Sequence, residues 1–199
     1  MSENNQNNLA GVLLAAGSSS RLGQPKQLVT WNSKTLLDIA IEKLLPICDA
    51  GVFVITGAYA EEIESSILHY PLTIIRNQDW RRGMNSSLRC GLEAVLHSNA
   101  IASLIMLCDQ PLLKREHIES LVKSWNEDIS QPAATRYNNS NGVPAILPVS
   151  SFKEINKSFG DVGARKYLEK LPNNRLVVVG NSEFDIDTIE DLEKLNEKK

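Results

Sequence analysis

The sequence predicts an α/β fold of three layers, α/β/α, with a mainly parallel central sheet. Short apolar or β-branched runs alternate with segments whose apolar residues recur at helical spacing along most of the 199 residues. Hydrophobic residues make up 42% of the chain, which is enough for a sizeable core. In such a sheet, ligands bind at the carboxyl ends of the strands, so functional residues should directly follow strands.

Five segments have the composition of strands bounded by turn residues, namely 9–15, 52–56, 73–76, 104–108 and 175–179. Three amphipathic helices are predicted between them, because apolar residues recur three or four positions apart within 37–45, 88–96 and 118–125. A short C-terminal helix is expected to begin near Glu190. The order of these elements favours parallel strands joined by helical crossovers.

The length favours one domain over residues 9–199, and the sequence contains no convincing internal repeat. Residues 1–8 are polar and rich in Asn, so we interpret them as a flexible N-terminal arm rather than a signal peptide. The segment 137–142 resembles a linker but is too short to separate domains. We expect it to be a mobile loop near the functional site.

Composition argues against several classes of partner. The formal net charge of −3 argues against a nucleic-acid-binding protein, which needs clustered Lys and Arg. The sequence has no apolar run of membrane-spanning length, so no membrane partner is expected. The three cysteines lack metal-ligand spacing, which is consistent with a cytoplasmic protein.

The first predicted strand runs into a loop over residues 17–26 that is rich in Gly and Ser. Its glycines allow the backbone to approach an anion closely, and the N–H groups of residues 18–20 can point at phosphate oxygens. Arg21 and Lys26 add two positive charges. These features predict a cradle for a triphosphate, with an ordinary surface turn as the alternative.

The loop matches neither of the two common phosphate-binding motifs. In the Walker A motif, Lys and Ser or Thr directly follow the second Gly, whereas Gln24 and Pro25 intervene here. The glycines also lack the spacing of the dinucleotide fingerprint. The triphosphate would therefore be held by a different loop type.

Asp109 directly follows the apolar strand 104–108. A carboxylate at the end of a buried strand is costly unless it is paired or coordinates a cation, and a triphosphate normally arrives with Mg²⁺. We therefore expect Asp109 to hold Mg²⁺, with a cap of a helix starting near Leu113 as the alternative. Asp187 could complete the metal shell or cap the C-terminal helix.

Six segments together resemble the molybdenum cofactor cytidylyltransferases, which are nucleotidyltransferases of the molybdopterin guanylyltransferase-like superfamily. In chain order they are Leu14-Ala-Ala-Gly-Ser-Ser-Ser-Arg-Leu-Gly-Gln-Pro-Lys26, Gly83-Met-Asn-Ser-Ser-Leu-Arg-Cys-Gly91, Asp109-Gln-Pro111, Gly142-Val-Pro-Ala-Ile-Leu-Pro148, Gly160-Asp-Val-Gly-Ala-Arg165 and Asp185-Ile-Asp-Thr-Ile-Glu-Asp-Leu192. They extend over nearly the whole chain. The resemblance implies a Rossmann-like nucleotidyltransferase fold.

The resemblance also implies a role for each matching residue. Arg21 and Lys26 would bind the β- and γ-phosphates and act in catalysis together with Asp109. The implied nucleotide site further contains Ala15, Ala16, Gly17, Ser18, Ser19, Gly83, Ser86 and Ser87. Plain helix capping is the alternative for the two serines of the second segment.

A second-substrate site is implied by the fourth and fifth segments, with Gly142, Pro144, Asp161, Gly163 and Arg165 as its candidate residues. Arg165 would hold an anionic pterin phosphate, or else be an ordinary surface residue. The chain has Val143 where the family often has a polar residue, and Ile189 where a Pro is common. These departures bear on the second substrate and leave the phosphate and metal residues intact.

The resemblance implies transfer of CMP from CTP to the terminal phosphate of molybdopterin, with release of pyrophosphate and with Mg²⁺ held by Asp109 and Asp187. Related guanylyltransferases tend to have Gly-Gly at Ala16-Gly17, which favours CTP over GTP here. A molybdoenzyme apoprotein is a further candidate partner. The alternatives are GTP or another phosphorylated acceptor as substrate, and a molybdenum cofactor carrier without catalysis.

Overall fold

The computed structural model describes residues 7–138, 140–157, 163–179 and 185–197. Within them, seven strands form one sheet in the order β5-β4-β1-β6-β8-β7-β9. Their bounds are Leu9–Leu14 (β1), Val52–Thr56 (β4), Thr73–Arg76 (β5), Ala102–Leu107 (β6), Ala133–Arg136 (β7), Asn141–Pro148 (β8) and Leu176–Val178 (β9). Among the described strands of this sheet, only β8 pairs antiparallel with its neighbours, and the other pairs are parallel. The predicted mainly parallel sheet is therefore confirmed.

The five predicted strands agree closely with the structure, whereas two strands of the seven-stranded sheet and the two short strands over residues 30–31 and 34–35 were missed. β4 and β5 have the predicted bounds, and β1, β6 and β9 differ from them by one or two residues at their ends. β7 and β8 were not predicted. The expected loop over 137–142 is correspondingly shorter, because Asn141 and Gly142 already belong to β8.

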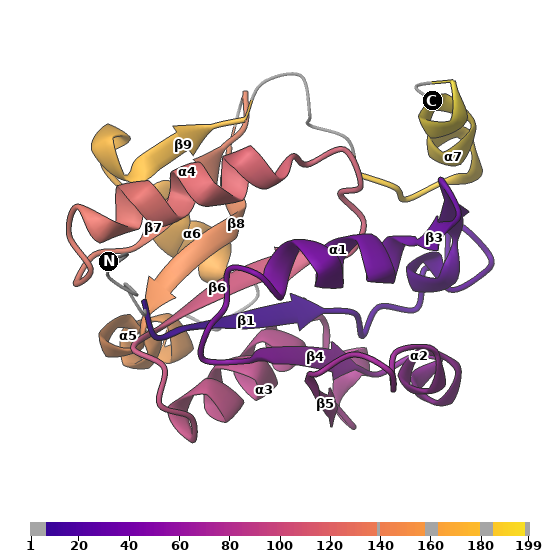
Figure 1. Ribbon diagram of the computed structural model, residues 1–199, viewed down its shortest axis with the longest axis horizontal. Coiled ribbons are helices and arrows are strands. Elements are labelled where there is room, and N and C mark those ends of the chain that lie inside the picture. The colour runs from indigo at the N-terminus through magenta and orange to yellow at the C-terminus, as the bar shows by residue number, and fades with distance from the viewer. Residues whose placement is uncertain (1–6, 139, 158–162, 180–184, 198–199) are drawn as a thin grey trace, which may run out of the picture.

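Helices cover both faces of the sheet, as Figure 1 shows. On one face lie α1 (Leu36–Leu44), α2 (Ala60–Ser66) and α4 (Arg115–Asn126), whose apolar residues share one core cluster. On the other face lie α3 (Met84–Leu96), α5 (Phe152–Lys157) and α6 (Gly163–Glu169), whose apolar residues share a second cluster. The predicted α/β/α layering is therefore confirmed.

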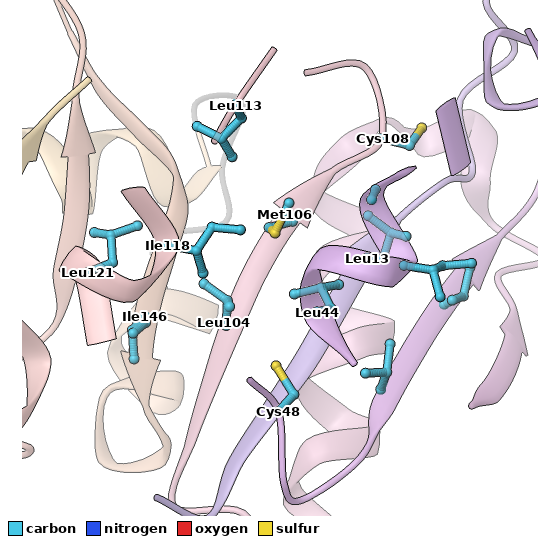
Figure 2. Packing of buried hydrophobic residues seen from close by; sticks show 14 of the residues in the cluster. Leu13, Leu44, Cys48, Leu104, Met106, Cys108, Leu113, Ile118, Leu121 and Ile146 are labelled. Carbon is cyan, nitrogen blue, oxygen red and sulfur yellow. The ribbon is translucent and has the colours of Figure 1, made fainter. Parts of the chain in front are cut away.

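The two core clusters are separated by the sheet because strand side chains alternate between its faces. In β1, Leu9 and Leu13 belong to the first cluster, whereas Ala10 and Val12 belong to the second, and all four are fully buried. Figure 2 shows Leu13 near Leu44 in the first cluster. Because β1 is buried on both faces, it rigidly positions the loop that follows its carboxyl end.

A close approach of helix and strand fixes α3 against β1. A Cβ atom added to Gly91 would lie 2.4 Å from Cγ1 of Val12, so no larger residue fits without a shift of one element. The first turn of α3 is thereby held beside the end of β1. That arrangement brings the residues after Gly83 close to the predicted phosphate loop.

The C-terminal helix α7 (Ile189–Asn196) packs beside a small hairpin of β2 (Thr30–Trp31) and β3 (Lys34–Thr35). Leu36, Ile186 and Leu195 form a third buried cluster there, with Trp31 and Leu192 packed against it. The hairpin follows the short 3-10 helix η1 (Lys26–Leu28). This contact brings residues 185–188 to the end of the loop that follows β1, where Lys26 contacts Asp187 (Figure 1). The other 3-10 helices are η2 (Trp80–Arg82), η3 (Val149–Ser151) and η4 (Asn173–Arg175).

Candidate active site

The loop after β1 is held in shape by Gln27, a buried side chain for which the sequence predicted no role. Its Nε2 donates to the carbonyl oxygen of Ala15 at 2.8 Å and to that of Gly17 at 2.9 Å. The carbonyl oxygen of Ala16 accepts from the N–H of Ala58 at 3.1 Å. Three successive carbonyl groups are therefore bonded to protein groups, which fixes the conformation of the loop.

In contrast to these carbonyl groups, several N–H groups of the same loop are not paired with any described residue. Among the described residues, the structure gives the N–H groups of residues 17–20 no hydrogen-bond partner. Ser19 has a φ of 50°, and its Oγ accepts from the N–H of Lys26 at 3.1 Å. A run of unpaired N–H groups with a left-handed residue is the geometry of an anion-binding nest.

Lys26 connects three separate segments of the chain. Its Nζ donates to Asp109 Oδ2 at 2.5 Å, to Asp187 Oδ1 at 3.1 Å and to the carbonyl oxygen of Ile186 at 3.4 Å. An ammonium group has three donors, and each of them has an acceptor here. Arg21 lies 3.5 Å from the other oxygen of Asp187 and is mostly exposed. The predicted cations and carboxylates are thus brought together.

The charge of Lys26 is secured by its partners. Burial lowers the pKa of the ammonium, but the charge and hydrogen bond of Asp109, together with the hydrogen bond of Asp187, outweigh burial and hold that pKa above its ordinary value. Burial also raises the pKa of the neighbouring Cys108 to about 12. At neutral pH the pair therefore presents a cation and a protonated, inert thiol.

The carboxylates of Asp109 and Asp187 fit a hard divalent cation. Oδ1 of Asp109 is buried and has no hydrogen-bond partner among the described residues, and Asp187 is half-buried. Mg²⁺ binds through one or two carboxylates together with substrate phosphate oxygens. In the described part of the chain, no group of three or more His, Cys, Asp or Glu could hold a metal ion. Nucleotide phosphates would have to complete such a shell.

Neither carboxylate caps a helix, so the capping alternatives are wrong. Helix α4 begins at Arg115 with Lys114 at its N-cap, well beyond Asp109. At α7 the N-cap is Thr188, which forms a capping box with Asp191. Asp109 is instead joined to the C-terminal segment, because its carbonyl oxygen accepts from the N–H of Ile186 at 3.0 Å.

Ser86 and Ser87 lie in the first turn of α3, whose N-cap is Gly83 with a φ of 95°. No side chain caps this helix, so the capping alternative is wrong for them too. Asn77 donates to both hydroxyls, at 2.8 Å to Ser86 and 3.0 Å to Ser87. The Ser86 hydroxyl in turn donates to backbone carbonyl oxygens, one of which belongs to Gly83.

Gly83 and Ser87, but not Ser86, line a cavity of about 360 Å³, which we call the loop cavity. Its lining includes Ala16, Gly17, Ser18, Lys26, Ser87 and Asp109. Trp80 also lines it, and the guanidinium of Arg81 lies 4.4 Å from the centre of the Trp80 ring. The cavity thus combines a loop with unpaired N–H groups, a cation and an aromatic wall.

A second cavity of about 350 Å³, the apolar cavity, adjoins the first, because Leu14, Met84 and Leu107 line both. It lies among α3, the start of β8 and α6, and Leu88, Val143 and Leu168 supply more of its apolar lining. Asp109 lines the loop cavity, while the next residue, Gln110, lines the apolar cavity. Two ligands could therefore meet beside Asp109.

The residues predicted to bind a second substrate do not all line the apolar cavity. Gly142 lines the apolar cavity, whereas Pro144 is buried in β8 and is not among the lining residues. Gly163 is the first residue of α6. Asp161 and the side chain of Arg165 lie outside the described residues. The segment 137–142 contributes Tyr137, Ser140 and Asn141 to the cavity, so it does lie near the site.

Proteins of known sequence resemble the chain over different extents. It is 31% identical to nicotine blue oxidoreductase of Paenarthrobacter nicotinovorans over 197 residues, which cover 94% of this chain and 96% of that protein. It is 33% identical to the molybdenum cofactor cytidylyltransferase of Escherichia coli strain K12 over 85 residues, which cover 42% and 44% of the two chains.

Solved structures share the fold along nearly the whole chain. Rv0371c of Mycobacterium tuberculosis H37Rv has a TM-score of 0.81 and 27% identity, with 95% of this chain and 97% of that chain covered. The same protein has been solved in complex with manganese, with a TM-score of 0.75, 25% identity and 96% and 99% coverage. The model of the MobA-like NTP transferase domain matches residues 11–176, which include most of β1, the loop after it and Asp109. The chain therefore belongs to the family of MobA-like NTP transferase domains.

Proposed function

We propose that the protein transfers CMP from CTP to the terminal phosphate of molybdopterin and releases pyrophosphate, with residues 9–199 acting as one domain. The observation that carries this proposal is the Lys26 ammonium held between Asp109 and Asp187, beside the unpaired N–H groups of the loop. This arrangement supports binding of an anion and its counter-cation. The adjoining apolar cavity supports a second substrate.

The reaction is a direct displacement. An oxygen of the acceptor phosphate monoester forms a bond to the α-phosphorus, the bond between the α-phosphorus and the bridging oxygen breaks, and pyrophosphate leaves. The acceptor is already ionised near neutral pH, so it needs no strong base. The thiol of Cys108 is protonated and buried, so it does not act as a nucleophile. Catalysis therefore depends on positioning and on neutralisation of charge.

Each residue of the cluster has a distinct task in this displacement. The N–H groups of the loop bind and orient the β- and γ-phosphates, while Lys26 and Arg21 neutralise the charge that develops on pyrophosphate. Asp109 and Asp187 would hold Mg²⁺, which when bound neutralises and aligns phosphate oxygens. Ala15, Ala16, Ser87 and Gly83 would border the base and ribose.

The choice of CTP and molybdopterin is supported by particular residues and relatives. Ala16 lines the loop cavity at the position where guanylyltransferases tend to have Gly. The matching relative from Escherichia coli is a molybdenum cofactor cytidylyltransferase. Gly142 and the helix that begins at Gly163 would contact the pterin substrate, with Asp161 and Arg165 as candidates for its phosphate. A molybdoenzyme apoprotein would receive the product in the cytoplasm.

A second candidate function comes from the relative that matches over almost the full length, an oxidoreductase. An enzyme of that class would use a redox cofactor and would release no pyrophosphate. The clustered Lys26, Asp109 and Asp187 favour phosphoryl chemistry, because hydride transfer needs no carboxylate pair bridged by a cation. In the described part of the chain, no helix is long and apolar enough to cross a bilayer.

The direct test is pyrophosphate release with each of the four ribonucleoside triphosphates in Mg²⁺, with and without reduced molybdopterin. We expect release with CTP only when molybdopterin is present. Preference for GTP would assign the protein to the guanylyltransferases, and a panel of sugar and organic phosphates would detect another acceptor. Binding without pyrophosphate release would indicate a carrier. Oxidation of NADH or NADPH by a dye substrate, measured in parallel, would indicate the oxidoreductase.

A further inference from the structure

Gln110 lines the apolar cavity and carries a buried hydrogen-bond acceptor. The residue is only 8% exposed, it lines the cavity, and its Oε1 has no hydrogen-bond partner among the described residues. A buried carbonyl oxygen without a partner costs free energy relative to a paired one. A side chain in this state at a cavity wall is a candidate for ligand recognition.

The orientation of the Gln110 amide is fixed by its neighbours. Its Nε2 donates to Asp185 Oδ1 at 2.9 Å and to the hydroxyl of Tyr137 at 3.0 Å. Tyr137 uses its own hydroxyl proton to donate to the carbonyl oxygen of Val143 at 2.5 Å, so its oxygen is left to accept. A flipped amide would set Oε1 against the Asp185 oxygen, where no proton is available. Oε1 therefore remains an acceptor.

The remaining lining of the cavity limits what can reach that acceptor. Leu14, Leu88, Ile105 and Leu168 are among the apolar residues of its wall. Hydrocarbon walls favour a flat, uncharged ring and disfavour a charged group. The nearby Asp185 adds a second acceptor at the same end, next to Gln110. A ring that carries N–H donors on one edge satisfies both features.

We propose that Oε1 of Gln110 is a specificity-determining acceptor that binds an N–H donor on the ring of the second substrate. The N–H donor would belong to an exocyclic amino group, so the cavity would accordingly take planar, uncharged heterocycles with such an amino group at one edge. This inference rests on the proposed function, because it assigns the apolar cavity to the acceptor molecule. It adds the chemical group by which that molecule is selected.

The test is a fluorescence titration of the whole protein with two small probes that need no reaction. The first is pterin, which carries a 2-amino group, and the second is 4-hydroxypteridine, which lacks it. One hydrogen bond to a buried acceptor changes an affinity by about tenfold. We expect the wild-type protein to bind pterin about tenfold more tightly than the analogue.

Gln110→Met keeps the length of the side chain and removes the acceptor, so we expect it to bind both probes equally. Ser140→Ala is the matched control, because Ser140 lines the same cavity and is not a hydrogen-bond partner of the Gln110 amide, which donates to Tyr137 and Asp185; it should retain the preference. Thermal melting shows whether the variants are folded, and the comparison of the two probes on wild-type protein needs no variant.

Equal binding of the two probes, or binding of neither, by wild-type protein would overturn the inference. So would a folded Gln110→Met variant that still prefers pterin. These outcomes are separate from the proposed function. Pyrophosphate release with CTP and molybdopterin, but no preference between the two probes, would contradict only the inference. A preference for pterin without pyrophosphate release would contradict only the proposed reaction.

Discussion

Lys26 Nζ and Asp109 Oδ2 lie 2.5 Å apart although 83 positions separate the two residues in the sequence. The ion pair joins the loop after β1 to the end of β6, two parallel neighbours in the sheet. Asp187 adds a third segment through the same ammonium group. One ammonium group therefore holds three segments of the chain together.

Lys26→Met should lower kcat by about 100-fold or more, which corresponds to roughly 3 kcal/mol of transition-state stabilisation by one preorganised donor. The rate is measured at saturating nucleotide and metal, and circular dichroism checks that the variant is folded. Arg21→Met is the control: its side chain is 73% exposed, so a smaller loss is expected. A Lys26→Met rate near the wild-type value would remove Lys26 from the mechanism.

The ammonium of Lys26 and a divalent cation should compete for the same carboxylates. In the absence of nucleotide, we expect Lys26→Met to bind Mn²⁺ more tightly than wild-type protein, because two carboxylates lose their resident cation. Electron paramagnetic resonance of free Mn²⁺ measures this binding directly. Asp109→Asn in the same background should abolish the gain. Unchanged Mn²⁺ affinity in Lys26→Met would show that these carboxylates do not hold the metal.

Gln27→Met should both destabilise the protein and weaken nucleotide binding. The change leaves the carbonyl oxygens of Ala15 and Gly17 without their donor, and each unpaired buried polar group costs about 1–3 kcal/mol. Chemical denaturation and nucleotide titration measure the two effects. Gln24→Met, at an exposed position of the same loop, is the control and should alter neither. Equal stability of the two variants would contradict this role.

Lys43 gives a prediction for pH. Burial lowers the pKa of its ammonium to about 8 in the folded protein, compared with 10.5 as the ordinary value. Between pH 8 and pH 10.5, Lys43 is protonated in the unfolded chain but not in the folded protein, so the free energy of unfolding rises as pH increases through this range. This gain in stability is lost as pH falls through 8. Lys43→Met cannot titrate there.

As pH rises from 7 to 10, the free energy of unfolding of the wild-type protein should therefore increase relative to that of Lys43→Met. Urea unfolding at a series of pH values measures this difference. The hydrogen bond from Lys43 to the carbonyl oxygen of Pro111 adds an offset but does not change the sign of the trend. A difference that stays constant with pH would show that the Lys43 pKa is ordinary.

Local patterns were sufficient to predict β4 and β5, because their apolar runs are short and bounded by turn residues. They were insufficient for β8, since Pro144 argues against a strand within a sheet. The structure accommodates it by a shift in register: Ala134 pairs with Ala145, but Thr135 pairs with Gly142. The proline thus falls in the irregular stretch between these pairs.

The charged residues of the site were predictable because Lys and Asp beside strand ends already indicate their chemistry. Gln27 and Gln110 were not assigned roles, although both are buried at the site. An amide has no chemistry that is visible in the sequence, and its role depends on partners brought by the fold. For Gln110 these partners are Tyr137 and Asp185, which lie far along the chain.

The most direct test of the central claim is ³¹P NMR of the wild-type protein with CTP, Mg²⁺ and reduced molybdopterin. Nucleotidyl transfer predicts one new phosphoanhydride between CMP and the pterin phosphate for each pyrophosphate released. Formation of CMP or CDP without that linkage, or no change in the phosphorus spectrum while the protein oxidises a nicotinamide cofactor, would contradict the account.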